Sequence, residues 1–434
     1  MYHRLQKALA GVVFFGFTAG MTWASGMAHA QQLNPERRQQ FLADPLAAEQ
    51  RDPLLPTLSV DRPYSPLELQ MIANDLDQLN NTALLQLSAG DADAAFDLWL
   101  RELKLRRVLG TQAEFEAIQR VAGLAWTQQR PVEVQLLTLR TREIWDAVRQ
   151  SLGSLSEEPF ERQTEIDPGD SLISGATTID IDVLTEIAQT FTTLRDIDSA
   201  VAVYQQLIAL SSTRDEMLTT QQKALAELHL SWFQFSEAAD IYLALLAAAK
   251  EAGDIEQEID YLEQLAYSYQ QAESLTNAVR AQTDLVERYQ RQDDSEKLPG
   301  LLVAIAQNYR ALNLPTSAIE YYRAAYRAAQ RFDQFSFSAQ VLQDLGALYE
   351  SLAMTAEALG AYSLLVPIEQ QAYNDYGIMN AHDKIGQLQR RQGNDFEALK
   401  AFERGLVIAN RLNLREAYFI EQIEALAAAD VPSL

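Results

Sequence analysis

Residues 302–325 read LVAIAQNYRALNLPTSAIEYYRAA, and residues 342–365 read LQDLGALYESLAMTAEALGAYSLL. The two stretches repeat one arrangement of aliphatic, small and aromatic residues, 40 positions apart. Within each half of a stretch, apolar residues recur three and four positions apart, and a short polar break separates the halves. Such spacing places apolar side chains on one face of a helix. Each stretch therefore predicts two amphipathic helices joined by a short turn.

This arrangement occurs six times between residues 181 and 414. Each copy has an alanine in its second helix and a small residue twelve positions earlier in its first, where the two helices are expected to approach closely. The alanines are spaced by 38 residues once and by 40 thereafter, and a period of this length predicts a helical solenoid. The pairs are Ala188 and Ala200, Ala226 and Ala238, Ala266 and Ala278, Ala306 and Ala318, Gly346 and Ala358, and Gly386 and Ala398.

One copy is represented by Leu302, Ile305, Ala306, Tyr309, Ala318, Tyr322 and Ala325. In order and spacing these residues resemble the tetratricopeptide repeat family. The family's usual unit has about 34 residues, so the longer unit here is similar to its long-helix variants. The resemblance covers about 180–412 strongly and 67–150 weakly. It implies an all-α fold, a right-handed superhelical solenoid of antiparallel helix pairs.

The N-terminus has the pattern of an export signal. Arg4 and Lys7 precede an apolar stretch without ionisable side chains, and Ala28 and Ala30 are the small residues of a cleavage site. The sequence therefore predicts a Sec-type signal peptide at residues 1–30. It predicts export to the periplasm or another extracytoplasmic lumen. The alternative is an uncleaved N-terminal membrane anchor.

The rest of the chain divides by composition. Six prolines between residues 35 and 66 predict an extended tether at 31–66. Degenerate helical repeats are expected at 67–150, and an acidic loop or hinge, a candidate partner-contact segment, at 151–180. The six repeats follow at 181–414, and residues 415–434 are predicted to form a capping helix and tail. Pro367 is expected to end or kink the second helix of its copy.

Composition excludes several classes of function. The chain has 434 residues, 48% of them apolar, and no cysteine, so disulfides, thiol catalysis and cysteine-ligated metals are excluded. Its 35 Lys and Arg against 60 Asp and Glu give a formal net charge of −25. Phosphate recognition needs clustered cations, so nucleic acid is not expected as a partner. We interpret the acidity as a solvated coat.

No catalytic constellation is evident. His229 and His382 occupy different helical positions and are interpreted as packing residues, and the acidic run 293–296 as a turn that favours the next helix. The motifs of serine hydrolases, zinc proteases, phosphate-binding loops and dinucleotide-binding folds do not occur. The sequence therefore predicts no enzyme, no metal site and no cofactor. An enzyme with an unrecognised site in 152–180 stays an alternative.

The resemblance also implies a binding surface, since first helices of the family line a concave groove that holds a segment of a partner. Lys223 is followed by Glu227 where the carboxylate-clamping members need asparagine, so a chaperone-tail clamp is not expected. The residues at groove positions are Lys223, Glu227, Glu263, Tyr267, Gln270, Gln307, Arg310, Gln343, Glu350, Asp383, Gln387 and Arg390.

These observations predict an exported scaffold or adaptor that binds a protein or peptide segment. Its expected role is the assembly of a protein complex of the cell envelope. Two alternatives stay open: an assembly factor that also binds or delivers a divalent metal, and a structural oligomerisation module.

Overall fold

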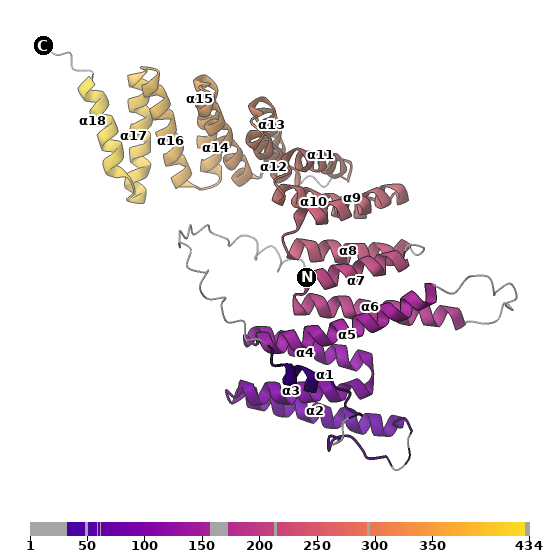
Figure 1. Ribbon diagram of the computed structural model, residues 1–434. Coiled ribbons are helices and arrows are strands. Elements are labelled where there is room, and N and C mark those ends of the chain that lie inside the picture. Colours follow the sequence, from indigo (N-terminus) through magenta and orange to yellow (C-terminus); the bar gives the residue numbers. More distant parts are fainter. Residues whose placement is uncertain are drawn as a thin grey trace. The chain divides into compact units, whose positions relative to one another are not determined.

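The computed structural model describes residues 33–47, 51–58, 60, 62–156, 172–211, 215–292 and 296–429 (Figure 1). The regular elements in these ranges are helices, and no strand occurs in them. The chain divides into two compact units, Met1–Leu210 and Ser211–Leu434. The predicted signal peptide lies outside the described residues. None of the helices in the described ranges is long and apolar enough to span a bilayer.

Most helices of the first unit pack against their neighbours in the chain, and α4 (Thr111–Thr127) also packs against α6 (Leu172–Leu194). Helix α2 begins with a capping box, in which the Ser65 hydroxyl accepts from the backbone N–H of Glu68 and the Glu68 carboxylate accepts from that of Ser65. Trp99 of α3 is fully buried, and its indole N–H donates to Asn80 of α2 at 2.9 Å. The elements are α1 (Pro35–Leu42), α2 (Pro66–Ser88), α3 (Ala92–Arg106), the 3-10 helix η2 (Arg107–Leu109), α4 (Thr111–Thr127), α5 (Pro131–Ser156), α6 (Leu172–Leu194) and α7 (Ile197–Ser211).

The predicted extended tether at 31–66 needs a correction, because it contains helix α1. Pro35 stands in the first turn of that helix, and the side chain of Asn34 caps it, so this proline begins a helix instead of preventing one. Phe41 is buried beneath the guanidinium of Arg107. Leu55 is also buried, in a cluster with residues of α2 and α3. The described part of this segment is therefore docked on the first unit.

Buried carboxylates hold the first unit together. Glu102, Glu114 and Glu133 are each at most 3% exposed, and each lies between two arginines. A buried charge needs an opposite charge and hydrogen bonds, and these pairs supply both. The ion pairs are Glu102 with Arg106 and Arg120, Glu114 with Arg107 and Arg140, and Glu133 with Arg37 and Arg130.

The predicted loop at 151–180 is shorter than expected. Helix α5 continues to Ser156 and α6 already begins at Leu172, so helix occupies both ends of the predicted segment. Residues 157–171, which include Pro159, Pro168 and Gly169, lie outside the described residues.

The second unit consists of helices that pack consecutively as antiparallel pairs. This arrangement confirms the predicted all-α solenoid of helix pairs. Helix α15 does not end at Pro367 but runs on to Gln371. The helices are α8 (Asp215–Ser231), α9 (Phe235–Ala252), α10 (Ile255–Gln271), α11 (Leu275–Gln292), α12 (Leu298–Ala311), α13 (Pro315–Arg331), α14 (Phe335–Ser351), α15 (Thr355–Gln371), α16 (Asp375–Arg391), α17 (Asp395–Leu412) and α18 (Glu416–Ala429).

Short turns join the helices of each pair, and each contains a residue with left-handed backbone conformation. Phe233, Glu273, Asn313 and Ala353 have φ between 56° and 60°. In the turn after α14, the N–H of Met354 donates to the carbonyl of Tyr349 at 2.9 Å, which satisfies one of the last carbonyls of the helix. The same turn geometry therefore forms without a glycine at these four positions.

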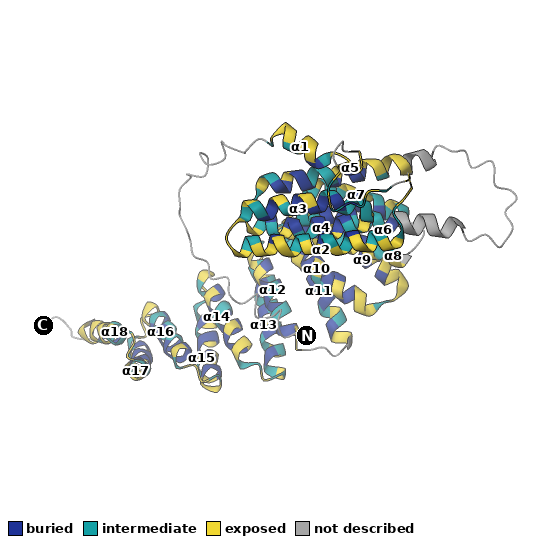
Figure 2. Cartoon of the chain, turned by 90° about the horizontal axis from the view of Figure 1, so that it is seen from below, coloured by how far each residue is buried: buried dark blue, intermediate teal, exposed yellow. Residues whose placement is uncertain are grey.

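Small residues and aromatic rings meet where the helices of a pair are closest. The six marker alanines from Ala200 to Ala398 are fully buried, and Figure 2 shows buried residues on the helix faces that meet a neighbour. A methyl group at Gly346 would lie 2.7 Å from the ring of Tyr362, and one at Gly386 would lie 2.6 Å from Phe402. The predicted close approach at the small residues is thus confirmed.

A larger side chain at a marker alanine is expected to destabilise the second unit. Ala358 is fully buried, and Ala358→Leu should lower the free energy of unfolding by about 1–3 kcal/mol through overpacking. Gln340→Leu on the exposed side of α14 is the matched control. Thermal unfolding followed by circular dichroism measures both variants. Equal melting shifts in the two would contradict the expected close packing.

Candidate functional site

The predicted groove residues lie on the first helices of five consecutive pairs, α8, α10, α12, α14 and α16. Those nearest the start of the second unit face solvent. Tyr267 is 48% exposed and meets the ring of Phe235 edge to face at 6.2 Å between centroids, and Gln270 is also exposed. Four others are exposed, and their side chains make no hydrogen bond or ion pair within the described part of the chain: Lys223, Glu227, Gln307 and Arg310.

Two carboxylates predicted to line the groove instead bond side chains of the following repeat. Glu263 accepts from the hydroxyl of Tyr289 and from the ammonium of Lys297 at 3.1 Å. Glu350 accepts from Tyr362 at 2.6 Å and from Lys384 at 3.0 Å. Burial alone would raise the pKa of Glu350, but these hydrogen bonds outweigh it and hold that pKa below its usual value. Both lysines lie beyond the carboxylate's own helix pair, so these contacts connect successive repeats.

The remaining predicted residues also have intramolecular partners. Gln343 donates to buried Glu369 at 2.9 Å. Asp383 is only 6% exposed and accepts from Arg415 and Tyr418, both at 2.7 Å. The last two bond residues of α18: Gln387 donates to Tyr418, and Arg390 donates to Gln422. The surface that remains open for a partner therefore lies on α8, α10 and α12.

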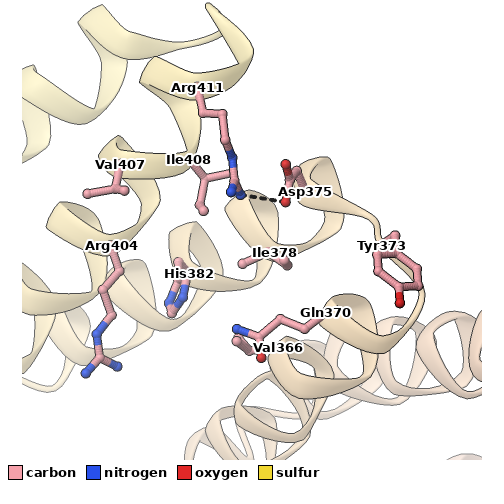
Figure 3. Close-up of a pocket in the computed structure, with 10 residues that line it drawn as sticks. All are labelled: Val366, Gln370, Tyr373, Asp375, Ile378, His382, Arg404, Val407, Ile408 and Arg411. Carbon is pink, nitrogen blue, oxygen red and sulfur yellow. Dashed lines mark hydrogen bonds and ion pairs between the residues drawn. The ribbon is translucent and has the colours of Figure 1, made fainter.

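A second feature is a groove of about 740 Å³ formed by α15, α16 and α17 (Figure 3). We call it the α15–α17 groove. Ile378 and His382 of α16 form its floor, and both are buried. Val407 of α17 lines one wall and is 67% exposed. Apolar and cationic groups thus line one concavity.

One of the two arginines in the α15–α17 groove has a counter-ion in the part of the chain that the structure describes, and the other does not. Arg411 forms an ion pair with Asp375 at 2.5 Å, drawn as a dashed line in Figure 3. The Arg404 side chain is exposed and forms no ion pair or hydrogen bond within the described residues. Burial, with a smaller effect of Arg404, lowers the pKa of His382 to about 4. At neutral pH the histidine is therefore uncharged, and the groove carries an uncompensated arginine.

Sequence reasoning did not find the α15–α17 groove. His382 replaces the leucine found at Leu302 and Leu342, and it was interpreted only as a packing residue. The available signal was on α17, where Arg404, Val407 and Arg411 follow the spacing that places residues on one helix face. In the copy before, a groove that overlaps this position in part has Leu342 in its lining and holds about 270 Å³.

The histidines and acids give no metal centre in the described residues. His229 is buried, and its Nδ1 lies 2.7 Å from the side-chain oxygen of Gln234. Within the described ranges no group of three or more His, Asp or Glu side chains is placed to hold a metal ion. Three residues of the acidic run, 293–295, lie outside them.

One repeat of the chain matches a known family model. Residues 299–332, the pair α12–α13, match the family model described as tetratricopeptide repeat, which supports this family for the repeat and indicates no catalytic family. No curated protein matches the chain. That the 40-residue unit belongs to a long-helix variant of the family stays a prediction.

Several solved structures are similar to parts of the chain. BtubC (BKLC) from P. vanneervenii is 19% identical, with 50% of this chain and 92% of that chain covered and a TM-score of 0.35. MamA is 18% identical, with 44% and 96% covered and a TM-score of 0.31. Aspartyl phosphate phosphatase F from Bacillus subtilis is 13% identical, with 71% and 78% covered and a TM-score of 0.35.

Proposed function

We propose that the chain is a scaffold that binds protein partners through the first-helix surface of α8, α10 and α12. The supporting observation is that exposed side chains without intramolecular bonds gather on these helices, among them Lys223, Glu227, Gln307 and Arg310. Aromatic residues and arginines are the side chains that most often dominate binding energy at interfaces, and Tyr267 and Arg310 provide both types here. A polar or extended partner segment suits this mixture of hydrogen-bonding groups.

The proposal includes export and a role in assembling an envelope complex. Its support is the basic, apolar and small-residue order of residues 1–30, with the uncleaved anchor as the alternative. Mature protein that begins after Ala30, identified by mass spectrometry of its N-terminus, would support export. An intact signal segment in the cytoplasmic fraction would argue against it.

Partner capture should depend on the exposed first-helix residues. We expect Tyr267→Ala with Arg310→Ala to reduce capture by roughly tenfold or more, since truncating an interface anchor costs about 2 kcal/mol or more. Partners are first identified by crosslinking and mass spectrometry in the native envelope. Capture of each is then quantified by pull-down with the purified chain and its variants.

The matched control is Phe396→Ala with Arg280→Ala, an exposed aromatic residue and an exposed arginine on second helices. This pair should leave capture unchanged. Undiminished capture by a folded Tyr267→Ala, Arg310→Ala variant would remove the first-helix surface from consideration.

A further inference from the structure

The α15–α17 groove departs from the repeat that surrounds it. At the position of His382, neighbouring copies have Leu302 and Leu342, which satisfy packing without a polar group. At the position of Arg404, the two preceding copies have Leu364 and Ala324. The groove holds about 740 Å³, and a groove of about 270 Å³ on α13, α14 and α15 one repeat earlier shares only three of its positions, those of Tyr326, Leu342 and Leu364. Packing of a repeat array requires neither the arginine nor a groove of this volume.

The chemistry of the groove selects one kind of occupant. Arg411 already has Asp375 as its counter-ion, so Arg404 is the cation left for a ligand. A guanidinium binds a carboxylate through two parallel hydrogen bonds. Beside it, Val407 presents an exposed apolar side chain, and Ile378 lies below. An acidic side chain next to an aliphatic one would satisfy both parts of the groove.

We propose that the α15–α17 groove is a second protein-binding site, which takes a partner segment with an aliphatic residue followed within one helical turn by a carboxylate. The carboxylate pairs with Arg404, and the aliphatic side chain covers Val407 and Ile378. Arg411 and Asp375 form the rim as a fixed ion pair. The net positive charge of the groove complements such a segment, although the chain as a whole has a net charge of −25.

This site is separate from the first-helix surface of the proposed function. The groove is formed by α15, α16 and α17, whereas the first-helix surface lies on α8, α10 and α12, and the two share no residue. Loss of one site therefore leaves the other intact. The two proposals can be tested and can fail independently.

Fluorescein-labelled ten-residue peptide pools provide the probe. One pool has leucine and glutamate fixed three positions apart, and the second and third have glutamine or lysine in place of the glutamate. Binding to the full chain is measured by fluorescence anisotropy. We expect the glutamate pool to bind at least tenfold more tightly than the other two, and Arg404→Glu to remove this preference.

Arg327→Glu is the matched control, because Arg327 is an exposed arginine in the smaller groove one repeat earlier. It should change binding of the glutamate pool less than twofold, as should Tyr267→Ala with Arg310→Ala. Circular dichroism verifies that each variant is folded. Equal binding of the three pools, absence of binding by all of them, or equal losses in Arg404→Glu and Arg327→Glu would each overturn the proposal.

Discussion

Glu114→Gln is expected to lower the free energy of unfolding of the first unit by about 3–5 kcal/mol. The Glu114 carboxylate is 3% exposed and accepts from Arg140 at 2.7 Å and Arg107 at 3.1 Å. Glutamine keeps the shape of the side chain but removes its charge. The Arg107 guanidinium, itself largely buried, would then lose its counter-ion in a poorly solvated place.

The effect should reach helix α1. Arg107 donates to the backbone carbonyls of Phe41, Leu42 and Ala43, and its guanidinium lies over the ring of Phe41. If the guanidinium moves toward water, these bonds are lost and α1 is released. We therefore expect faster proteolytic cleavage near residue 43 in the variant than in the parent chain.

Tryptophan fluorescence during urea unfolding measures the first unit well, because Trp99, Trp126 and Trp145 belong to it. Glu116→Gln is the control, since Glu116 is exposed on the same helix and should be replaceable within about 0.5 kcal/mol. Similar midpoints for Glu114→Gln and Glu116→Gln would show that the buried ion pairs do not stabilise the unit.

The helix pairs could be predicted because their signal is local and periodic. The small residue and the aromatic ring that meet, as Gly346 and Tyr362 do, lie 16 positions apart, so the contact recurs in each copy at the same place in the pattern. The backbone conformation of the turns was harder to predict from the sequence. Phe233 and Ala353 adopt the left-handed region without the glycine that usually signals it.

Long-range contacts account for what the sequence could not reveal in the first unit. A proline such as Pro35 either interrupts a helix or begins one, and the sequence alone does not decide between them. Arg37 and Glu133 are 96 positions apart and meet only in the fold. No periodic pattern relates such partners, so the docking of α1 and the buried ion pairs were not predicted.

For the same reason, only part of the candidate site could be predicted from the sequence. Exposure of the first-helix row follows from helical periodicity, which placed Lys223 and Gln307 at the surface. Partners of Glu263, Glu350 and Asp383 come from later parts of the chain, and no periodic pattern pairs these residues. A groove volume depends on the difference between side chains at facing positions. It emerges only when three helices are assembled.

Acidification should destabilise the second unit through His382. The ordinary pKa of histidine in an unfolded chain is about 6.5, and burial beside Arg404 lowers it to about 4 in the folded protein. Between these values the unfolded chain binds more protons than the folded one, so stability falls as the pH falls. The contribution of His382 is complete above about pH 6.5, and roughly 3 kcal/mol of it is lost by pH 4.

His382→Gln removes the titrating group and keeps a polar side chain of similar size, so the difference in unfolding free energy between parent and variant isolates this histidine. Other charged residues of the groove, Arg404, Arg411 and Asp375, are common to both chains and cancel in the difference. Urea unfolding at several pH values from 4 to 7, followed by circular dichroism, should show the variant gaining about 3 kcal/mol relative to the parent on acidification.

Arg404→Gln should reduce the pH dependence of the parent, because loss of the nearby positive charge raises the folded-state pKa of His382. Parallel pH profiles for the parent and His382→Gln would mean that His382 takes up its proton without opposing the fold, and that the floor of the groove is reached by water.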